Sequence, residues 1–486
     1  MLLLARTIKN RFAPISRVPP DVLSLIPDYC ETDRELIRMT HTCRYWREIL
    51  VSRASLWTFL TCQDLDKTSV YIQRSRGSPL EVRIDQENRE ILLLVIAHVG
   101  RLKALTIRFS GWARDLPRLL KYLGSTAPLL QKLRVHVQGK GTSNSDSTLF
   151  ENTLLDGNLS LLRELCLSGL HSNLPWRNMS NLLHFDFRRA GAKTSTNQLL
   201  DFFERAPLLR EIQLSRALPN SSTAPAKRVV SLPHLALLKI HDQTHHSTIL
   251  NHLHIPTGAL VMLEFEFGDQ SFPVPDYLPE SLDNFRNVSH ITSVNLDFDV
   301  GPAMRLNGPS GGLHMAGSSG FFPPMLEEQT LRLINWFPIS TTKSLTVSLY
   351  RVSADPNTEE SAAYQLLLPM KDLRTLTLMN CTNLSFILAL NPNHNTSNEV
   401  LCPKLEELVL YIQVRRGESL ADELLEMAKA RASRGARLSA IVIVCWWGFT
   451  VPGLENYTAR LEYSDVETPS WDSVPSEADV FGWDSF

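Results

Sequence analysis

The chain has 486 residues, of which 43% are hydrophobic and 21% charged, and its formal net charge is −2. This balance gives no reason to expect nucleic acid or an anionic membrane as a partner. Seven scattered cysteines without a C-x-x-C pair argue against a disulfide framework and a zinc site. The longest strongly apolar run, residues 440–447, is far shorter than the ~20 residues that span a bilayer. The composition therefore predicts a cytoplasmic or nuclear protein.

Residues 15–57 predict three short amphipathic helices. Pro19 and its neighbour Pro20 suit a first helical turn, where a missing N–H costs no hydrogen bond. The spacing places Val22, Leu23 and Ile26 on one face of this first helix.

The second helix begins at Thr32, whose hydroxyl is placed to form a capping box with Glu35. An apolar stripe then continues through both later helices. It consists of Leu36, Met39, Cys43, Trp46, Ile49 and Leu50. A unit of some forty residues buries too little surface to be comfortably stable alone. A partner or the following domain is therefore expected to cover part of it.

These residues resemble the F-box family, through the pattern Val-Pro-x-x-Val-Leu-x-x-Ile, then Leu-Ile, Cys-Arg-x-Trp and Leu-Trp. In that family the motif binds a Skp-type adaptor and, through it, a cullin-RING ubiquitin ligase. The resemblance implies adaptor binding by Pro19, Val22, Leu23, Ile26, Leu36, Ile37, Cys43, Trp46, Leu56 and Trp57. Two positions depart from the family pattern: Pro27 replaces an aromatic residue and Thr42 replaces an apolar one. They favour a second interpretation, in which the helices merely cap the next domain.

A repeat follows the helices. Residues 70–82 resemble the linker that follows the F-box in many fungal family members. The submotif apolar-x-x-apolar-x-apolar then recurs at intervals of mostly 20 to 33 residues, which is the leucine-rich-repeat range and a little above it. Its copies lie at 102–107, 130–135, 162–167, 182–187, 209–214, 235–240, 260–265, 291–296, 373–378, 405–410 and 438–443, with a weaker copy at 345–349.

Amphipathic segments between the copies predict helices that return the chain to the next strand, for example at 116–123, 199–203 and 424–428. A strand-turn-helix unit cannot bury its own apolar face, so neighbours must stack. We therefore predict an α/β protein: a short three-helix F-box followed by an irregular leucine-rich-repeat solenoid with a parallel sheet on its concave face. Unrelated leucine-rich strands of a compact α/β domain are the alternative.

The predicted domain order follows from these signals. It is a disordered leader at 1–12, the F-box at 13–60, a linker at 61–86, the solenoid at 87–460 and an acidic tail at 461–486. Two glycine- and serine-rich runs predict that 301–324 is a flexible loop within the solenoid.

The sequence contains no recognisable catalytic motif. No G-x-S-x-G elbow, P-loop or dinucleotide fingerprint is present. Five histidines crowd residues 241–254, yet they are expected to lie across a strand end and a loop, without a helical H-x-x-x-H that bears a glutamate and without a nearby cysteine. We therefore predict a non-catalytic protein without cofactor or metal.

Side chains that flank the buried leucines are expected to point outward on the concave sheet, because strand side chains alternate between faces. The predicted substrate-binding residues are Arg108, Arg134, Arg188, Lys239, His241, Glu264, Glu266, Asp297 and Tyr411. The early strands are basic, the middle ones acidic and the last more apolar, which suggests a groove for a partner of opposite charge order. Simple solvation of exposed positions is the alternative.

The predicted function is that of a substrate-recognition subunit of a Skp-cullin-F-box ubiquitin ligase, with the repeats holding an unidentified target protein. The alternative is a non-ligase scaffold whose degenerate F-box caps the solenoid. A hydrolase or transferase built on the repeats would need a catalytic constellation that the sequence does not show.

Overall fold

The structure is a computed structural model in which the chain divides into two compact units, residues 1–234 (unit 1) and 235–486 (unit 2). It describes residues 12–30, 32–85, 88–109, 127–137, 159–169, 179–188, 195–218, 228–242, 247–266, 278–297, 303–318, 336–348, 362–379, 384–394, 399–412, 418–445 and 449–465. The predicted leader, the expected helix at 116–123 and most of the acidic tail lie outside these ranges.

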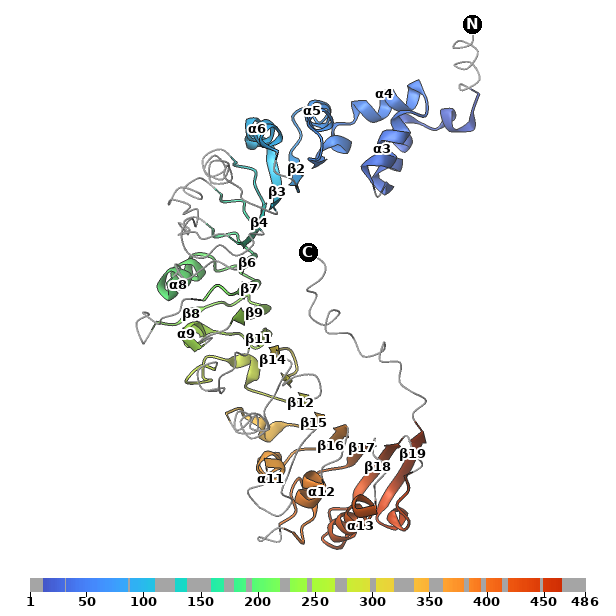
Figure 1. Cartoon of the computed structure of the whole chain (residues 1–486), viewed down its shortest axis with the longest axis vertical. Helices are drawn as coiled ribbons and strands as arrows, with labels where there is room; N and C mark the ends of the chain where they lie inside the picture. The colour runs from blue at the N-terminus through green and yellow to red at the C-terminus, as the bar shows by residue number, and fades with distance from the viewer. Residues whose placement is uncertain are drawn as a thin grey trace. The chain divides into compact units, whose positions relative to one another are not determined.

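Unit 1 begins with the three predicted helices, α2, α3 and α4 (Figure 1). The predicted capping box is confirmed: Thr32 Oγ1 accepts a hydrogen bond from the Glu35 amide at 3.3 Å, and the Glu35 carboxylate accepts one from the Thr32 amide at 3.2 Å. Leu23, Trp46 and Leu50 form the small core between the helices. The elements are η1 (Pro14–Arg17), α2 (Pro20–Leu25), η2 (Ile26–Tyr29), α3 (Asp33–Thr40), α4 (Arg44–Ser52) and η3 (Ala54–Trp57).

A buried junction ties these helices to the rest of unit 1. Trp57 has no exposed surface, donates its indole N–H to the Leu50 carbonyl at 2.9 Å, and packs edge-on against Tyr71 of α5. The carboxylate of Asp33 at the start of α3 accepts hydrogen bonds from Thr61 and Lys67, at 3.0 and 2.8 Å. The following domain therefore covers part of the helical unit, as its small size requires.

The repeated apolar positions of unit 1 lie on the buried side of a parallel sheet. Strands β1 to β7 pair in chain order, each parallel to the next. The register places equal positions of successive copies side by side, so Leu133 lies between Leu105 and Leu165, all fully buried. The strands are β1 (Phe59–Thr61), β2 (Leu80–Ile84), β3 (Leu102–Phe109), β4 (Lys132–Val137), β5 (Glu164–Ser168), β6 (His184–Arg188), β7 (Glu211–Ser215) and the short β8 (Val230–Ser231).

Helices α6 and α8 lie on one side of this sheet (Figure 1). The predicted helix at 199–203 is confirmed as α8, which Ser195 and Gln198 cap at its N-terminus. Its phenylalanines Phe202 and Phe203 pack against Phe185 of β6. The remaining helical elements in the described ranges of unit 1 are α5 (Leu65–Arg74), α6 (Arg89–Ala97), η4 (Val99–Arg101) and α8 (Thr196–Arg205).

Unit 2 contains a second run of paired strands, in the order β9, β11, β14, β13, β12, β15, β16, β17, β18, β19. All neighbours are parallel except those of β13, which is antiparallel to both β12 and β14. The strands are β9 (Leu237–Asp242), β10 (Leu253–His254), β11 (Leu260–Glu266), β12 (Ser293–Asp297), β13 (Ala303–Asn307), β14 (Gly312–Ser318), β15 (Ser344–Ser348), β16 (Thr375–Met379), β17 (Glu407–Ile412), β18 (Leu438–Cys445) and β19 (Thr458–Asp465). β19 thus extends five residues into the predicted tail.

The prediction of a flexible loop at 301–324 is wrong for residues 303–318, which form the hairpin β13–β14. Met304 and Leu306 alternate with polar residues and are buried, as are Leu313 and Met315 of the partner strand. Gly312 supports a close turn, because a Cβ there would lie 2.4 Å from the Leu306 carbonyl oxygen. The glycines therefore permit a tight strand pairing where composition alone suggested a loop.

Helices α11, α12 and α13 lie beside the strands β16 to β18 (Figure 1). The predicted helix at 424–428 is confirmed within α13. The helical elements in the described ranges of unit 2 are α9 (Ser247–Leu250), η6 (Arg286–Val288), η7 (Ile339–Thr341), α11 (Ala362–Leu367), α12 (Ser385–Leu390), α13 (Glu418–Ser433) and η8 (Leu454–Asn456). None of the helices in the described ranges is long and apolar enough to cross a bilayer.

A fully buried arginine organises the end of unit 2. Arg431 of α13 donates to the Leu401 and Cys402 carbonyls at 2.8 and 3.0 Å, and burial lowers its pKa to about 10. Cys402 has a φ of 48°, a left-handed conformation that exposes its carbonyl to the guanidinium. The α/β architecture with mostly parallel strands confirms the predicted class at that level, whereas the leucine-rich-repeat solenoid stays a prediction.

Candidate partner-binding surfaces

An exposed apolar stripe runs along α2 and η2. It consists of Val22, Leu25, Ile26 and Tyr29, whose exposed fractions are 49, 53, 37 and 87%. Their spacing of three, four and seven residues places them on one helical face. Leu23 points the other way and is 1% exposed. The prediction that Val22, Leu23 and Ile26 share a face is therefore wrong, because the core of the helical unit takes Leu23 alone.

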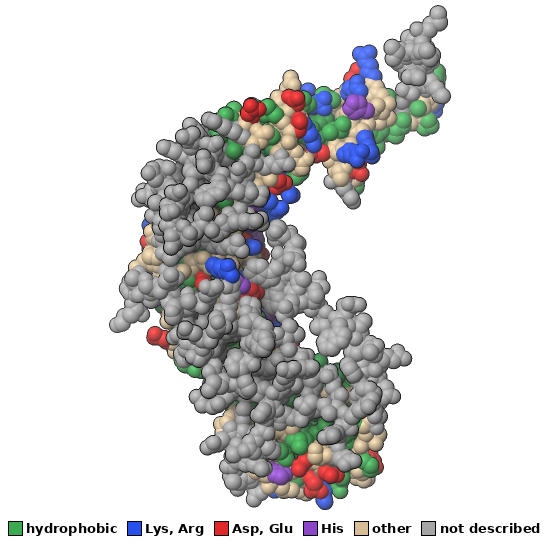
Figure 2. Space-filling model, in the orientation of Figure 1, with side chains coloured by type: hydrophobic (Ala, Val, Ile, Leu, Met, Phe, Trp, Pro, Cys, Tyr) green, Lys and Arg blue, Asp and Glu red, His purple; other side chains and the backbone are tan. Residues whose placement is uncertain are grey.

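The other predicted adaptor-binding residues divide by burial. Leu36, Trp46 and Trp57 are buried within the chain, Ile37, Cys43 and Leu56 are half-buried, and Pro19 is exposed. The buried side chains hold the helices together and are not accessible to a partner in this conformation. The apolar stripe also contains Leu25 and Tyr29, which sequence reasoning missed; extending the helical spacing beyond Ile26 would have found them. Figure 2 shows hydrophobic side chains at the surface of these N-terminal helices.

Neither departure from the F-box pattern falls within the apolar stripe. Pro27 is buried in η2, where its lack of an N–H fits the first turn of a 3-10 helix, and its carbonyl accepts from the Cys30 amide at 3.0 Å. Thr42 is exposed and its hydroxyl lies 3.5 Å from the Arg38 carbonyl. The two substitutions therefore leave the exposed apolar surface intact.

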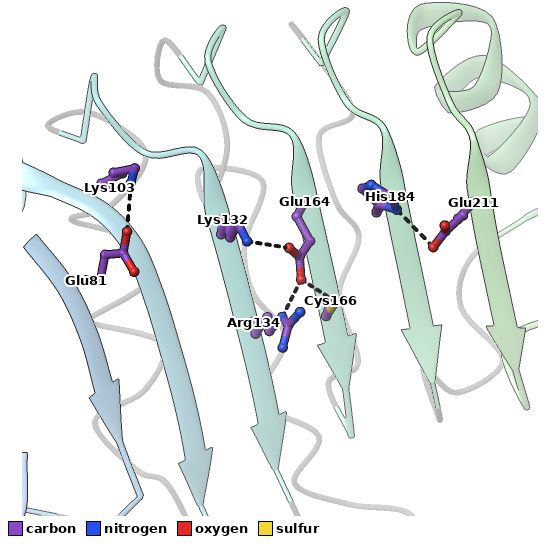
Figure 3. A network of polar contacts seen from close by, with 8 residues as sticks. All are labelled: Glu81, Lys103, Lys132, Arg134, Glu164, Cys166, His184 and Glu211. Atoms are coloured by element: carbon purple, nitrogen blue, oxygen red, sulfur yellow. Dashed lines mark hydrogen bonds and ion pairs between the residues drawn. The ribbon is translucent and has the colours of Figure 1, made fainter. Parts of the chain in front are cut away.

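The polar face of unit 1 carries ion pairs that link neighbouring strands (Figure 3). Arg134 of β4 pairs with Glu164 of β5, which also accepts an ion pair from Lys132 at 3.6 Å. On β6, Arg188 binds Asp186 through two hydrogen bonds of 2.7 and 2.8 Å. Two of the three predicted substrate-binding arginines of this unit are thus neutralised by carboxylates of the chain itself.

The third arginine of this set, Arg108 at the end of β3, differs from the other two. It is half-buried and has no ion-pair or hydrogen-bond partner in the described part of the chain.

Cys166 lies between the charged groups, and its pKa is raised to about 12, chiefly by burial and then by Asp186 and Glu164. This thiol therefore stays protonated and is not a nucleophile at neutral pH.

Three predicted residues of unit 2 form one charge cluster. The Glu264 carboxylate of β11 lies 3.6 Å from Lys239 Nζ and 3.0 Å from His241 Nδ1, both on β9. Less than a fifth of each of these side chains is exposed. This mutual pairing cancels much of the charge that the predicted basic-to-acidic gradient requires. Asp297 and Tyr411 are half-buried, and the side chain of Glu266 lies outside the described residues.

The described residues do not form a metal site. They contain no group of three or more His, Cys, Asp or Glu side chains placed to hold an ion. His252 of the histidine-rich segment is buried, and His245 and His246 lie outside the described ranges.

Comparison with protein families identifies the N-terminal segment. A family model described as F-box-like matches residues 15–63. This F-box-like segment covers the apolar stripe, the small core of Leu23, Trp46 and Leu50, and strand β1. No curated protein matches the chain. F-box domains are typically non-catalytic modules that generally bind Skp-type adaptors, so the match suggests involvement in substrate recognition by an SCF-type ubiquitin ligase.

Proposed function

We propose that this chain is a non-catalytic substrate-recognition subunit of a Skp-cullin-F-box ubiquitin ligase. The observation that supports it most directly is the apolar stripe within the F-box-like segment. The stripe is exposed, whereas the core residues Leu23, Trp46 and Leu50 of the same segment are buried. Neighbouring apolar side chains on one short helix commonly mark a protein-binding surface. The F-box-like segment would thus bind the adaptor, and the strands and helices that follow it in units 1 and 2, here called the sheet units, would hold the target.

Burial of the stripe supplies a physical reason for binding. Fully burying an apolar side chain that was exposed is worth roughly 1.5–3 kcal/mol. The four residues of the stripe start from exposures of 37 to 87%, so much of that surface is still available to a partner. The chain itself would contribute proximity and orientation of the target, which lower an activation barrier without any catalytic side chain.

The sheet units are the proposed target-binding part. Their strands place polar side chains on one face while the apolar submotif positions are buried. A leucine-rich-repeat solenoid of this kind offers a long surface whose exposed residues vary without disturbing the core. The protein would act in the cytoplasm or the nucleus.

The test is a pull-down of the full chain with a purified Skp-type adaptor. The informative variant is Val22→Glu/Leu25→Glu, because both side chains are about half exposed and carry little of the core. A matched control is Val70→Glu/Leu93→Glu, which adds the same charges at exposed apolar positions of α5 and α6. Circular dichroism and thermal melting establish that all three proteins are folded.

We expect the wild type and the control to retain the adaptor and the stripe variant to lose it. Binding that is equal in both variants would reject the stripe as the contact surface. No binding by a folded wild type would favour the scaffold alternative. The buried junction through Trp57 and Asp33 supports that alternative, because it fixes the helices to the first strand as a cap would be fixed.

A further inference from the structure

The polar face of unit 1 carries a row of polar side chains at the C-terminal ends of its strands. The register aligns Arg108 of β3 with His136 of β4, His136 with Ser168 of β5, and Ser168 with Arg188 of β6. We call these four residues the end row. Because neighbouring strands lie about 4.8 Å apart, its first three members are consecutive neighbours and Arg188 lies one strand further.

The polar groups nearer the strand starts are occupied by one another. Lys103 binds Glu81 at 2.7 Å, and His184 lies 2.9 Å from Glu211 (Figure 3). Arg134 and Lys132 share Glu164, as described above. These ion pairs connect side chains of adjacent strands, so the charged groups near the strand starts stabilise the sheet itself.

The end row is different. The side chains of Arg108, His136 and Ser168 have no hydrogen-bond or ion-pair partner in the described part of unit 1, and all three are half-buried. Asp85, which follows the neighbouring strand β2, binds Arg83 of its own strand at 2.8 Å. Half-buried polar groups without a partner among the described residues are available to bind a ligand.

The local charge favours an anion. Burial lowers the pKa of His136, and Arg188, Arg108 and Arg134 lower it further against the opposing effect of Asp186. The imidazole is therefore neutral at pH 7 and able to donate one hydrogen bond. Beside it, Arg108 carries a positive charge without a partner among the described residues, whereas the carboxylates of Glu164 and Asp186 are each paired with an arginine.

We propose that Arg108, His136 and Ser168, with Arg188 beside them, bind an anionic group, a phosphate or a carboxylate, carried by a polypeptide partner. The guanidinium of Arg108 would supply charge and paired donors, and the imidazole and hydroxyl would supply single hydrogen bonds. A polypeptide is favoured over nucleic acid because the chain has a formal net charge of −2, which gives no long-range attraction for a continuous phosphate backbone. The inference deepens the proposed function, since this partner would be the ligase target.

The test uses the full chain on an immobilised library of degenerate peptides with a fixed central phosphoserine, glutamate, serine or lysine. Its variants are Arg108→Gln and, as the matched control, Lys132→Gln. Both remove one positive charge from the same face, but Lys132 lies near the strand starts and pairs with Glu164. The strongest peptide is then measured by fluorescence anisotropy at two salt concentrations.

We expect the wild type to prefer phosphoserine or glutamate over serine and lysine, and Arg108→Gln to weaken binding about tenfold or more, as for a lost charge-assisted hydrogen bond. The control should change it less than threefold. Preference for phosphoserine alone identifies phosphate, and equal preference for glutamate shows that a carboxylate suffices. No preference for anionic peptides, or equal losses in both variants, would overturn the proposal. Because no adaptor is present, this outcome is independent of the pull-down.

Discussion

Truncating Leu23 to alanine should unfold the N-terminal helices, whereas truncating its neighbour Val22 should not. Leu23 is 1% exposed in the small core with Trp46 and Leu50, whereas Val22 is 49% exposed. A buried Leu→Ala change costs about 3–5 kcal/mol through lost burial and the cavity left behind. A unit of about 45 residues, at roughly 0.05–0.15 kcal/mol per residue, has only about 2–7 kcal/mol.

Hydrogen exchange of the full chain, followed by mass spectrometry, measures this difference locally. Leu23→Ala should remove most protection from amides of α2, α3 and α4 while strands β3 to β6 keep theirs, because local units open independently of the global core. Val22→Ala should change protection by less than about 0.5 kcal/mol, as is usual for a surface position.

Adaptor binding then separates the two roles. Val22→Ala should weaken capture of a Skp-type adaptor in a protein that is still folded, whereas Leu23→Ala should weaken it through loss of structure. Equal loss of protection in both variants would refute the division into a closed core and an exposed stripe. Unchanged protection in Leu23→Ala would show that the junction with the sheet, and not this core, holds the helices.

Three further predictions concern the sheet units. Arg431→Met should lower the free energy of unfolding by about 2–4 kcal/mol in urea, because the buried Leu401 carbonyl would lose its donor and the Cys402 carbonyl would lose one of its two donors; an unchanged midpoint would contradict this. Burial and a nearby arginine lower the pKa of His314 to about 4. Since the unfolded chain takes up this proton at the ordinary histidine pKa of about 6.5, the free energy of unfolding should fall by about 2 kcal/mol between pH 7.5 and pH 5. The variant His314→Gln should lack this loss in parallel denaturation curves. Gly169→Ala should destabilise by about 1–3 kcal/mol, since φ is 72° and a Cβ would lie 2.0 Å from the Val137 carbonyl oxygen; Gly77→Ala, with open space around it, is the control for the thermal melts.

The local signals in the sequence predicted the elements well where they act within a few residues. The capping box at Thr32 and the helix at 199–203 form as expected, because side-chain caps and helical spacing depend on neighbours in the chain. The loop at 301–324 was predicted from its glycines and serines, and the hairpin there shows how pairing with β12 and β11 overrides composition.

The candidate surfaces were predicted less completely. Sequence spacing located the F-box-like segment but assigned Leu23 to the wrong face and omitted Leu25 and Tyr29. Alternation along the strands identified outward residues such as Arg134 and Glu264. It contained no information on which of them pair, because their partners come from other strands.

The sequence by itself determined the N-terminal helices, the spacing of the apolar submotif and the α/β class, since these follow from local periodicity and capping. Only the tertiary structure decided which stripe of α2 and η2 stays exposed, and that Arg108, unlike Arg134 and Arg188, has no partner in the described part of the chain. Both depend on contacts between residues distant in the chain, which set how much of each side chain is buried and which charges meet.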